Sequence, residues 1–225
     1  MQEEVFQTAA DVAYRIISQK ILDGEFPPGM KLSRRKMAEV TSVSVIPVIE
    51  ALKKLEEDGL VESKPQWGSF VTIPNRKKIM DCYQLREAIE CQVARIVSQK
   101  SSPERMQELI YIATELDTVP YQENSAMDSR NNHLNFHQGL AELTDNDMLV
   151  ITLSRINLFW VLCKALGVRA SKIQYPRYWH RKLLDEINTG DPERAERAMR
   201  EHILDSLGPI LATLPESEQK APDNQ

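Results

Sequence analysis

The stretch SVIPVIEALKKLEEDGLVESKPQWGSFVTI (residues 44–73) decides the fold of the N-terminal part of this protein. Its first half has apolar residues at helical spacing. Ser44 is a suitable N-cap, and Pro47 lies in the first turn, where a missing N–H costs no hydrogen bond. Gly59 ends the helix. The runs on either side of residues 64–68 are predicted to form two short strands, so a β-hairpin follows the helix.

Two more helices are predicted upstream of this stretch. Apolar residues recur at helical spacing over residues 8–22, and glycine and proline at residues 24–29 stop that helix. Ser33 is a good N-cap for a short helix over residues 34–40, which a brief turn at residues 41–43 joins to the next helix. Three helices with a short turn between the second and the third, followed by a hairpin, make a winged helix-turn-helix.

The whole chain is predicted to be mainly α, in two domains. Residues 1–74 form the winged helix-turn-helix with its small β-hairpin wing, and residues 75–79 form a polar, basic linker. Residues 80–215 have helical patterns throughout and predict an all-α antiparallel helical bundle. Residues 216–225 are polar and predict a flexible tail.

The bulk composition excludes several classes of protein. Hydrophobic residues make up 42% and charged residues 27% of the 225 positions, as in ordinary globular proteins. The net charge of −5 does not indicate a polyanion partner. The chain has neither a membrane-spanning apolar run nor a secretory signal. Three scattered cysteines indicate reduced thiols, and hence a cytoplasmic protein.

All four histidines lie in the predicted helical domain. His133 and His137 occupy positions i and i+4 of the segment NNHLNFHQGL (residues 131–140), so a helix places both imidazoles on one face. His180 and His202 each share the apolar face of an amphipathic helix. A buried imidazole needs partners for its ring nitrogens, and one metal ion could satisfy all four side chains. For each histidine alone, a hydrogen bond to a carbonyl or carboxylate is the simpler alternative.

The N-terminal pattern resembles the head-domain signature of the GntR transcription regulators. The matching residues are Gly24, Pro28-Gly29, Leu32-Ser33, Ala38, Val43-Ser44, Pro47-Val48, Glu50-Ala51-Leu52, Leu55, Asp58-Gly59-Leu60-Val61 and Gly68-Ser69-Phe70-Val71. The resemblance implies a homodimer that binds double-stranded DNA at a palindromic operator.

The C-terminal part is similar to the FadR-type effector domain, FCD. The similarity runs through residues 83–90, Phe136-His137, Asn146, His180, Gly190-Asp191, Ala195 and His202. In metal-binding members, an aspartate four residues before the Phe-His histidine, that histidine and two later histidines bind a divalent ion. The resemblance therefore implies a metal site at His137, His180 and His202, with His133 in the position of the aspartate.

Histidine in place of this aspartate changes the expected chemistry. Ligation by nitrogen alone favours zinc, nickel or copper over magnesium or calcium, so zinc is the predicted cofactor and nickel the alternative. Four imidazoles leave the charge of the ion uncompensated. A small organic acid, of the kind this family senses, is therefore the predicted effector, bound directly to the metal. Arg86 is a candidate second anchor for the acid, with a structural ion pair as the equal alternative.

The head departs from the family at its expected DNA contacts. The family normally has arginines at the positions of Val45 and Ile49, and commonly one at the wing position of Trp67. The predicted DNA contacts are Arg34, Arg35, Lys36, Ser44, Val45, Ile49 and Trp67. The cationic cluster Arg34-Arg35-Lys36 could bind phosphates. Val45 and Ile49 could contact thymine methyl groups, which favours a site rich in A·T pairs.

Three functions are compatible with these patterns. The first is a non-enzymatic transcription regulator in which metal and acid bias the orientation of two heads on DNA. The second is a ligand-sensing scaffold that has lost tight DNA binding. The third is a metal-dependent hydrolase, but this needs a general base, and the sequence has no HExxH motif and no clear carboxylate for that role.

Overall fold

The computed structural model describes residues 7–100, 103–118, 126–167, 178–212 and 214. The chain divides into two compact units. Unit 1 comprises Met1–Pro74 and Leu158–Leu166, and unit 2 comprises Asn75–Asn157 and Gly167–Gln225. Helix α7 (Asp147–Gly167) therefore contributes residues to both units.

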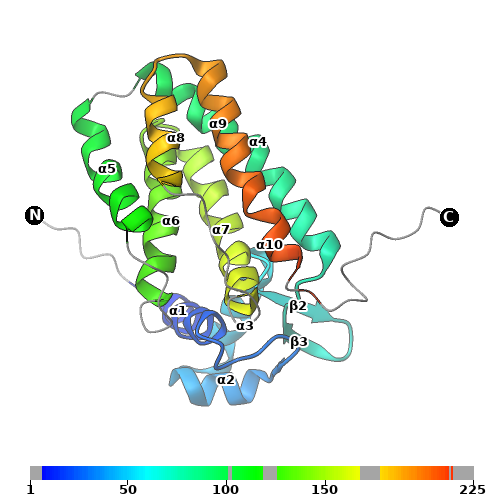
Figure 1. The fold of residues 1–225 in the computed structure, drawn as a ribbon. Coiled ribbons are helices and arrows are strands. Elements are labelled where there is room, and N and C mark those ends of the chain that lie inside the picture. Colours follow the sequence, from blue (N-terminus) through cyan, green and yellow to red (C-terminus); the bar gives the residue numbers. More distant parts are fainter. Residues whose placement is uncertain (1–6, 101–102, 119–125, 168–177, 213, 215–225) are drawn as a thin grey trace, which may run out of the picture. The chain divides into compact units, whose positions relative to one another are not determined.

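Residues 7–74 of unit 1 form three helices and a three-stranded antiparallel sheet (Figure 1). The elements are α1 (Ala9–Leu22), β1 (Lys31–Leu32), α2 (Arg34–Thr41), α3 (Val45–Glu57), β2 (Val61–Lys64) and β3 (Gly68–Val71). The strand order is β1-β3-β2, with Lys31 opposite Phe70 and Glu62 opposite Phe70 on the other side. The predicted winged helix-turn-helix is confirmed. Strand β1 was not predicted, because two residues are too few to show an alternating pattern.

Local chemistry fixes the ends of these helices. Thr8 and Asp11 form a reciprocal capping box at the start of α1. Ser42 adopts φ 56° between α2 and α3, which makes the tight turn of the helix-turn-helix. Gly59, at φ 77°, ends α3 in a conformation that a side chain would strain.

The core of unit 1 joins all of its elements. Its buried members are Ala13, Ile17, Ile21, Phe26, Leu32, Met37, Val48, Ala51, Leu52, Leu55, Leu60, Val61, Val71 and Leu162. Leu162 comes from α7, and Leu158 and Phe159 of the same helix pack against this core. These α7 residues were predicted to belong to the C-terminal domain, but they complete the apolar core of the winged head.

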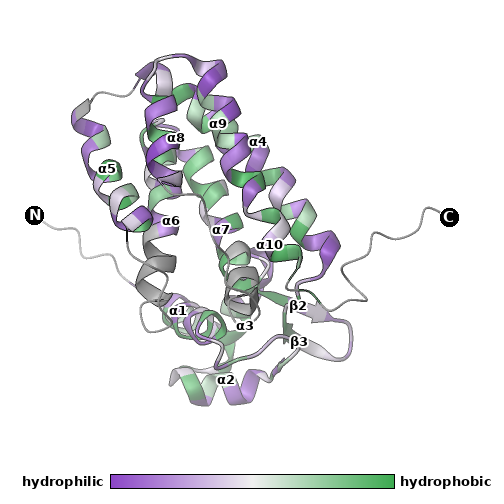
Figure 2. Ribbon diagram, viewed as in Figure 1, coloured by the Kyte–Doolittle hydropathy of each residue, from purple (hydrophilic) through white to green (hydrophobic). Residues whose placement is uncertain are grey.

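Unit 2 is helical, as predicted. It contains α4 (Arg76–Lys100), α5 (Pro103–Thr118), α6 (Ala126–Glu142), the first part of α7, α8 (Trp179–Ile187), α9 (Pro192–Asp205) and α10 (Leu207–Leu211). Helices α4 and α9 lie side by side and run in opposite directions (Figure 1). Helix α8 packs against α9 and α5, and α5 packs against α6. Hydrophilic and hydrophobic segments alternate along α4 and α9, as expected for helices with one apolar face (Figure 2).

The segment predicted as a linker differs from the expectation. Residues 76–79 form the first turn of α4, and the side chain of Asn75 accepts a hydrogen bond from the backbone N–H of Lys78. An asparagine cap can start a helix in a basic segment that has no apolar periodicity. The predicted tail, residues 216–225, lies outside the described residues. No helix in the described part of the chain has the length and apolar character needed to cross a membrane.

Candidate metal centre

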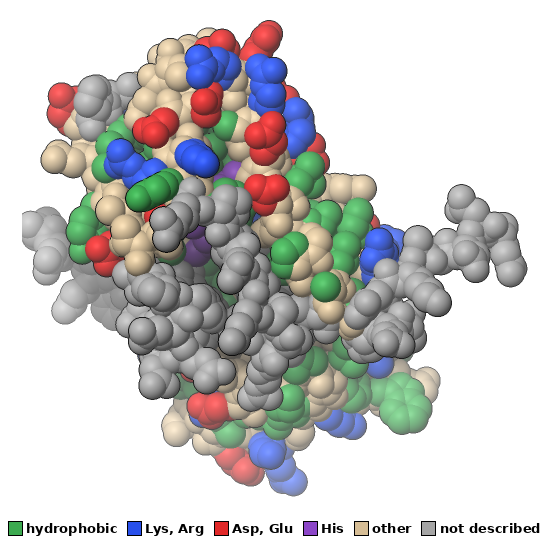
Figure 3. Space-filling model, in the orientation of Figure 1, with side chains coloured by type: hydrophobic (Ala, Val, Ile, Leu, Met, Phe, Trp, Pro, Cys, Tyr) green, Lys and Arg blue, Asp and Glu red, His purple; other side chains and the backbone are tan. Residues whose placement is uncertain are grey.

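Three helices of unit 2 bring the four histidines into one buried region. His133 and His137 are on α6, His180 is in the first turn of α8, and His202 is near the end of α9. All four are buried, and on the face drawn in Figure 3 histidine shows only as small purple patches. The helical faces on which the sequence placed these side chains are therefore turned inward.

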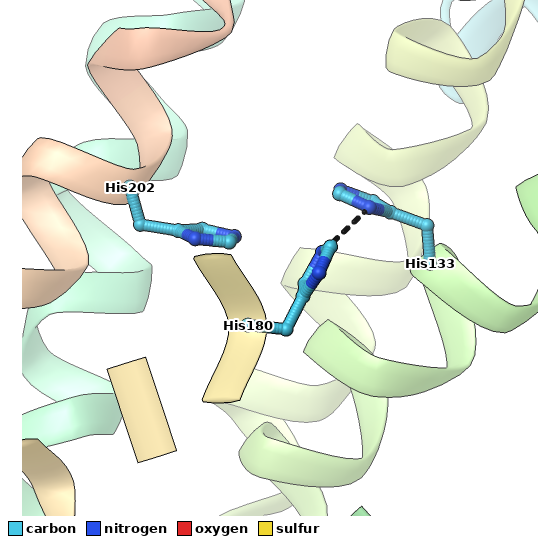
Figure 4. A group of neighbouring side chains, drawn as sticks. All are labelled: His133, His180 and His202. Atoms are coloured by element: carbon cyan, nitrogen blue, oxygen red, sulfur yellow. Dashed lines mark hydrogen bonds between the residues drawn. The ribbon is translucent and has the colours of Figure 1, made fainter. Parts of the chain in front are cut away.

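Three of the imidazoles form a close group. One ring nitrogen from each of His133, His180 and His202 lies within 4.8 Å of the others. Figure 4 shows the three rings converging from separate helices. The Nε2 atom of His180 lies 3.1 Å from Nδ1 of His133. Three nitrogen donors at such separations could bind a single ion after small side-chain movements.

His137 lies beside this group. Its Nε2 atom is 3.1 Å from Nε2 of His133, and its ring centroid is 5.2 Å from that of His202. The ring of His133 thus lies between the rings of His137 and His180, with one nitrogen facing each. The predicted fourth ligand is close to the other three, although it is outside the tightest group.

Asp117 of α5 holds His180 in place. Its carboxylate oxygen Oδ1 lies 2.8 Å from Nδ1 of His180, and the carboxylate also accepts hydrogen bonds from the backbone N–H groups of His180 and Arg181. Burial alone would raise the pKa of Asp117, but the hydrogen bonds from His180 and from the two N–H groups outweigh it and lower the pKa. Asp117 therefore stays ionised, and it turns Nε2 of His180 toward His133.

Glu90 of α4 has the same relation to His137. Its carboxylate lies 2.5 Å from Nδ1 of His137 and accepts a 2.7 Å hydrogen bond from Nε of Arg86. The Arg86 and Glu90 side chains are almost completely buried. Burial would raise the pKa of Glu90, but the charge of Arg86 and the contact with His137 lower it to about 2. Glu90 is therefore an ionised carboxylate inside the core.

These two carboxylates change the charge balance that the sequence suggested. A carboxylate on the outer nitrogen of an imidazole is the usual support of a metal-binding histidine, because it fixes the tautomer and strengthens the ligand. Glu90 and Asp117 contribute two negative charges around the histidines, and Arg86 contributes one positive charge. The protein itself therefore supplies part of the compensation that the all-imidazole set was expected to lack.

Neither carboxylate was identified from the sequence. The i, i+4 spacing of Arg86 and Glu90 was a usable signal for an ion pair. Asp117 gave no such signal, because its role depends on how α5 packs against α8. The contact with Glu90 is the structural ion pair that was the alternative role for Arg86, and an effector contact by Arg86 stays a prediction.

Aromatic side chains pack against the histidines, and two buried thiols lie elsewhere, on α4. The ring of Trp179 stacks on that of His202 with centroids 3.8 Å apart, and Phe136 lies edge-on to His180 at 5.1 Å. These contacts restrict rotation of the imidazoles and exclude water. Burial raises the pKa of Cys82 and of Cys91 to about 11, so both thiols stay protonated and are poor metal ligands.

The predicted DNA contacts are all exposed on unit 1. Arg34, Arg35 and Lys36 occupy the first turn of α2, Ser44, Val45 and Ile49 the start of α3, and Trp67 the turn between β2 and β3. Trp67 is 70% exposed. The Ser44 side chain makes no capping hydrogen bond to α3, so its hydroxyl is available to another molecule.

Comparison with known proteins adds family information. Residues 9–71 match the family model described as bacterial regulatory proteins, gntR family, and residues 81–205 match the FCD domain. An uncharacterized HTH-type transcriptional regulator in an unstable DNA locus of Streptomyces ambofaciens is 28% identical over 211 residues, which cover 90% of this chain and 86% of the relative. The HTH-type transcriptional repressor RspR of Escherichia coli (strain K12) is 27% identical over 205 residues, covering 84% and 83%.

Two solved structures share the fold. E. coli McbR/YncC has a TM-score of 0.75 at 16% identity and covers 92% of this chain and 99% of that chain. A GntR family member from Pseudomonas syringae pv. tomato str. DC3000 has a TM-score of 0.52 at 21% identity, covering 91% and 86%. At these identities the likeness establishes the fold alone.

Proposed function

This chain belongs to the GntR family of DNA-binding transcription regulators and carries an FCD domain, and from this premise we propose that it is a metal-dependent sensor of small carboxylates. In the proposal the protein is a cytoplasmic homodimer. The FCD domain holds a divalent transition metal, and a small organic acid bound to the metal changes the affinity of the two heads for operator DNA.

One observation carries the metal part of the proposal. Nitrogen atoms of His133, His180 and His202 approach within 4.8 Å of one another in a buried region. The outer nitrogens of His137 and His180 are each held by a carboxylate. An apolar core gains nothing from gathering imidazoles in this way, whereas a metal site requires it. The donor set is nitrogen only, which favours zinc, with nickel as the alternative.

The effector part follows from coordination chemistry. Bound at these imidazoles, the ion would act as a Lewis acid that holds the carboxylate of the effector. The chain's own residues would orient the ligands and keep water out. Arg86 remains the candidate second anchor for the acid, although its ion pair with Glu90 already gives it a structural role.

Asp117 provides a test of the metal site that spares every proposed ligand. Asp117→Asn is expected to weaken metal binding about 10–100-fold, because the amide no longer fixes the tautomer of His180. The measurement is competition for zinc against a chromophoric chelator. Asp145→Asn is the matched control, since Asp145 forms an exposed ion pair with Arg105. Equal zinc affinities of the two variants would contradict the proposed role of His180.

The DNA part is tested by electrophoretic mobility shift on double-stranded fragments selected from a random library. Binding is expected to weaken steeply with salt, because released counterions dominate the affinity. The variant Arg34→Ala/Arg35→Ala/Lys36→Ala should bind more weakly and lower the slope of log K against log salt by roughly 0.9 for each phosphate that is no longer neutralised. Lys77→Ala is the control, because Lys77 pairs with Asp81 in unit 2. An unchanged slope would exclude the cluster as a phosphate clamp.

Two other functions have weaker support. At three positions where the family has arginines this chain has exposed apolar residues, Val45, Ile49 and Trp67, which favours a scaffold that has lost DNA affinity. In that case the unmodified protein would not bind DNA, and the variant Val45→Arg/Ile49→Arg would. A hydrolase needs a carboxylate free to act as a general base. Glu90 and Asp117 each hold a histidine instead, so neither is placed for that role.

A further inference from the structure

The first turns of α3 present an apolar surface that the fold of unit 1 does not use. Val45 is 41%, Ile46 71% and Ile49 40% exposed. Positions i, i+1 and i+4 of a helix lie on one side of it, and the buried residues of α3 point into the core on the other side. We call Val45, Ile46 and Ile49 the apolar face of α3. Three neighbouring branched side chains in water are unusual on a surface helix, where the outer face is normally polar.

Cationic side chains lie on the same two helices. Arg34, Arg35 and Lys36 occupy the first turn of α2, and Lys53 lies one turn beyond Ile49 on α3. None of these four cations forms an ion pair with any residue that the structure describes. Other cations of the same unit do: Lys54 lies 3.5 Å from Asp11, and Lys20 pairs with Glu25.

The wing has the same mixture of charge and apolar surface. Lys31 and Lys64 lie over the ring of Phe70 at 5.9 and 5.2 Å, and the exposed Trp67 occupies the turn. Over the parts of Figure 3 that correspond to α2 and the wing, basic and hydrophobic side chains lie next to one another, with some acidic side chains among them near α2. A partner that fits must therefore carry negative charge at its edges and an apolar group at its centre.

The major groove of DNA at thymine has this chemistry. Phosphates line both edges of the groove, and the C5 methyl group of thymine is the apolar group on its floor. Aliphatic side chains can neither donate nor accept hydrogen bonds, so they cannot replace the water on a guanine or cytosine edge. The apolar face of α3 would therefore displace hydrogen-bonded water from every base pair that it covers, and only an A·T pair offers a methyl group to bury in return.

On the basis of the proposed function, we infer that Val45, Ile46 and Ile49 select the operator through the methyl groups of thymine. Specificity for the DNA sequence then comes from apolar contact, while Arg34, Arg35 and Lys36 bind the phosphate backbone of the DNA. Ile46, the most exposed of the three, is assigned the main contact.

Uracil provides the test, because it pairs as thymine does and lacks only the C5 methyl group. A DNA fragment selected by the protein from a random library is made once with thymine and once with uracil. Affinity for the uracil fragment is expected to fall about fourfold for each contacted methyl group, the factor for removing one methyl group from water. The salt dependence of binding should be the same for both fragments, since the phosphates are unchanged.

Variants assign the effect to the apolar face. In Ile46→Ala/Ile49→Ala the difference between thymine and uracil DNA should largely disappear. Ile73→Ala is the matched control, because Ile73 is an exposed isoleucine of unit 1 outside α3; it should keep the full difference. Circular dichroism melting confirms that both variants fold, as expected for exposed positions.

The possible failures are distinguishable. Equal affinity for thymine and uracil DNA overturns the inference and leaves DNA binding intact. A difference that persists in Ile46→Ala/Ile49→Ala also overturns it, because other residues then read the methyl groups. If no fragment binds at low salt, with or without zinc and carboxylates, the inference and the DNA part of the proposed function fall together, and the apolar face is left to a protein partner or a second copy.

Discussion

The variant His180→Ala is expected to lose the transition metal that we propose for the unmodified protein. His180 contributes one of the three nitrogens that lie within 4.8 Å of one another. Its removal also leaves Asp117 without the imidazole that it orients. Loss of supporting residues alone typically costs about 10–100-fold in metal affinity, and loss of a ligand should cost more. Elemental analysis of the purified proteins, after dialysis against a weak chelator, gives the metal content of each.

A second substitution separates ligand chemistry from folding. His133→Asp restores the carboxylate that the metal-binding members of the family have at this position. This variant should still bind a metal, but with its preference moved from zinc and nickel toward manganese, because a harder oxygen ligand replaces nitrogen. A His180→Ala protein with full metal content would remove the basis of the sensor proposal. A His133→Asp protein with the same metal selectivity as the unmodified protein would also remove that basis.

Glu90→Gln should strongly destabilise unit 2. The Arg86 and Glu90 side chains are 2% and 1% exposed, so the substitution leaves the guanidinium buried without its counter-charge. Breaking a buried ion pair by removing one partner typically costs about 3–5 kcal/mol of unfolding free energy. Urea denaturation followed by circular dichroism measures this difference, provided that metal-free protein is used for both forms.

Glu87→Gln is the matched control for this measurement. Glu87 lies on the same helix and pairs with Arg200, but the two side chains are 32% and 44% exposed. Partly exposed pairs contribute about 0–1 kcal/mol, so the control should be nearly neutral. Replacing both charges by apolar residues, Arg86→Met/Glu90→Leu, should cost less than Glu90→Gln alone. Similar losses in Glu90→Gln and Glu87→Gln would mean that the buried pair has no special energetic role.

The winged head was predictable because its signals are local. Ser33, Ser44 and Gly59 mark helix ends at the residue itself, and the apolar spacing of α3 alone specifies its buried face. Strand β1 escaped prediction because its two residues form a strand only by pairing with β3. Helix α7 shows a different limit of prediction. Helical periodicity indicates that Leu162 is buried, but it does not indicate which of the two cores the side chain enters.

The candidate site was only partly predictable for the same reason. The inward direction of each histidine followed from its helical face. Their convergence depends on the packing of α6, α8 and α9, and the family resemblance, rather than the spacing, indicated which positions meet. Glu90 and Asp117 reach the histidines from α4 and α5, and no pattern within either helix identifies such long-range partners.

Asp117 has one further consequence. Its single carboxylate contacts Nδ1 of His180 and accepts hydrogen bonds from the first backbone N–H groups of α8. The imidazole cannot swing toward or away from a captured ion without pulling on the carboxylate that anchors the helix. Binding of an ion to His180 would therefore act directly on the backbone at the start of α8, without a series of intermediate side chains.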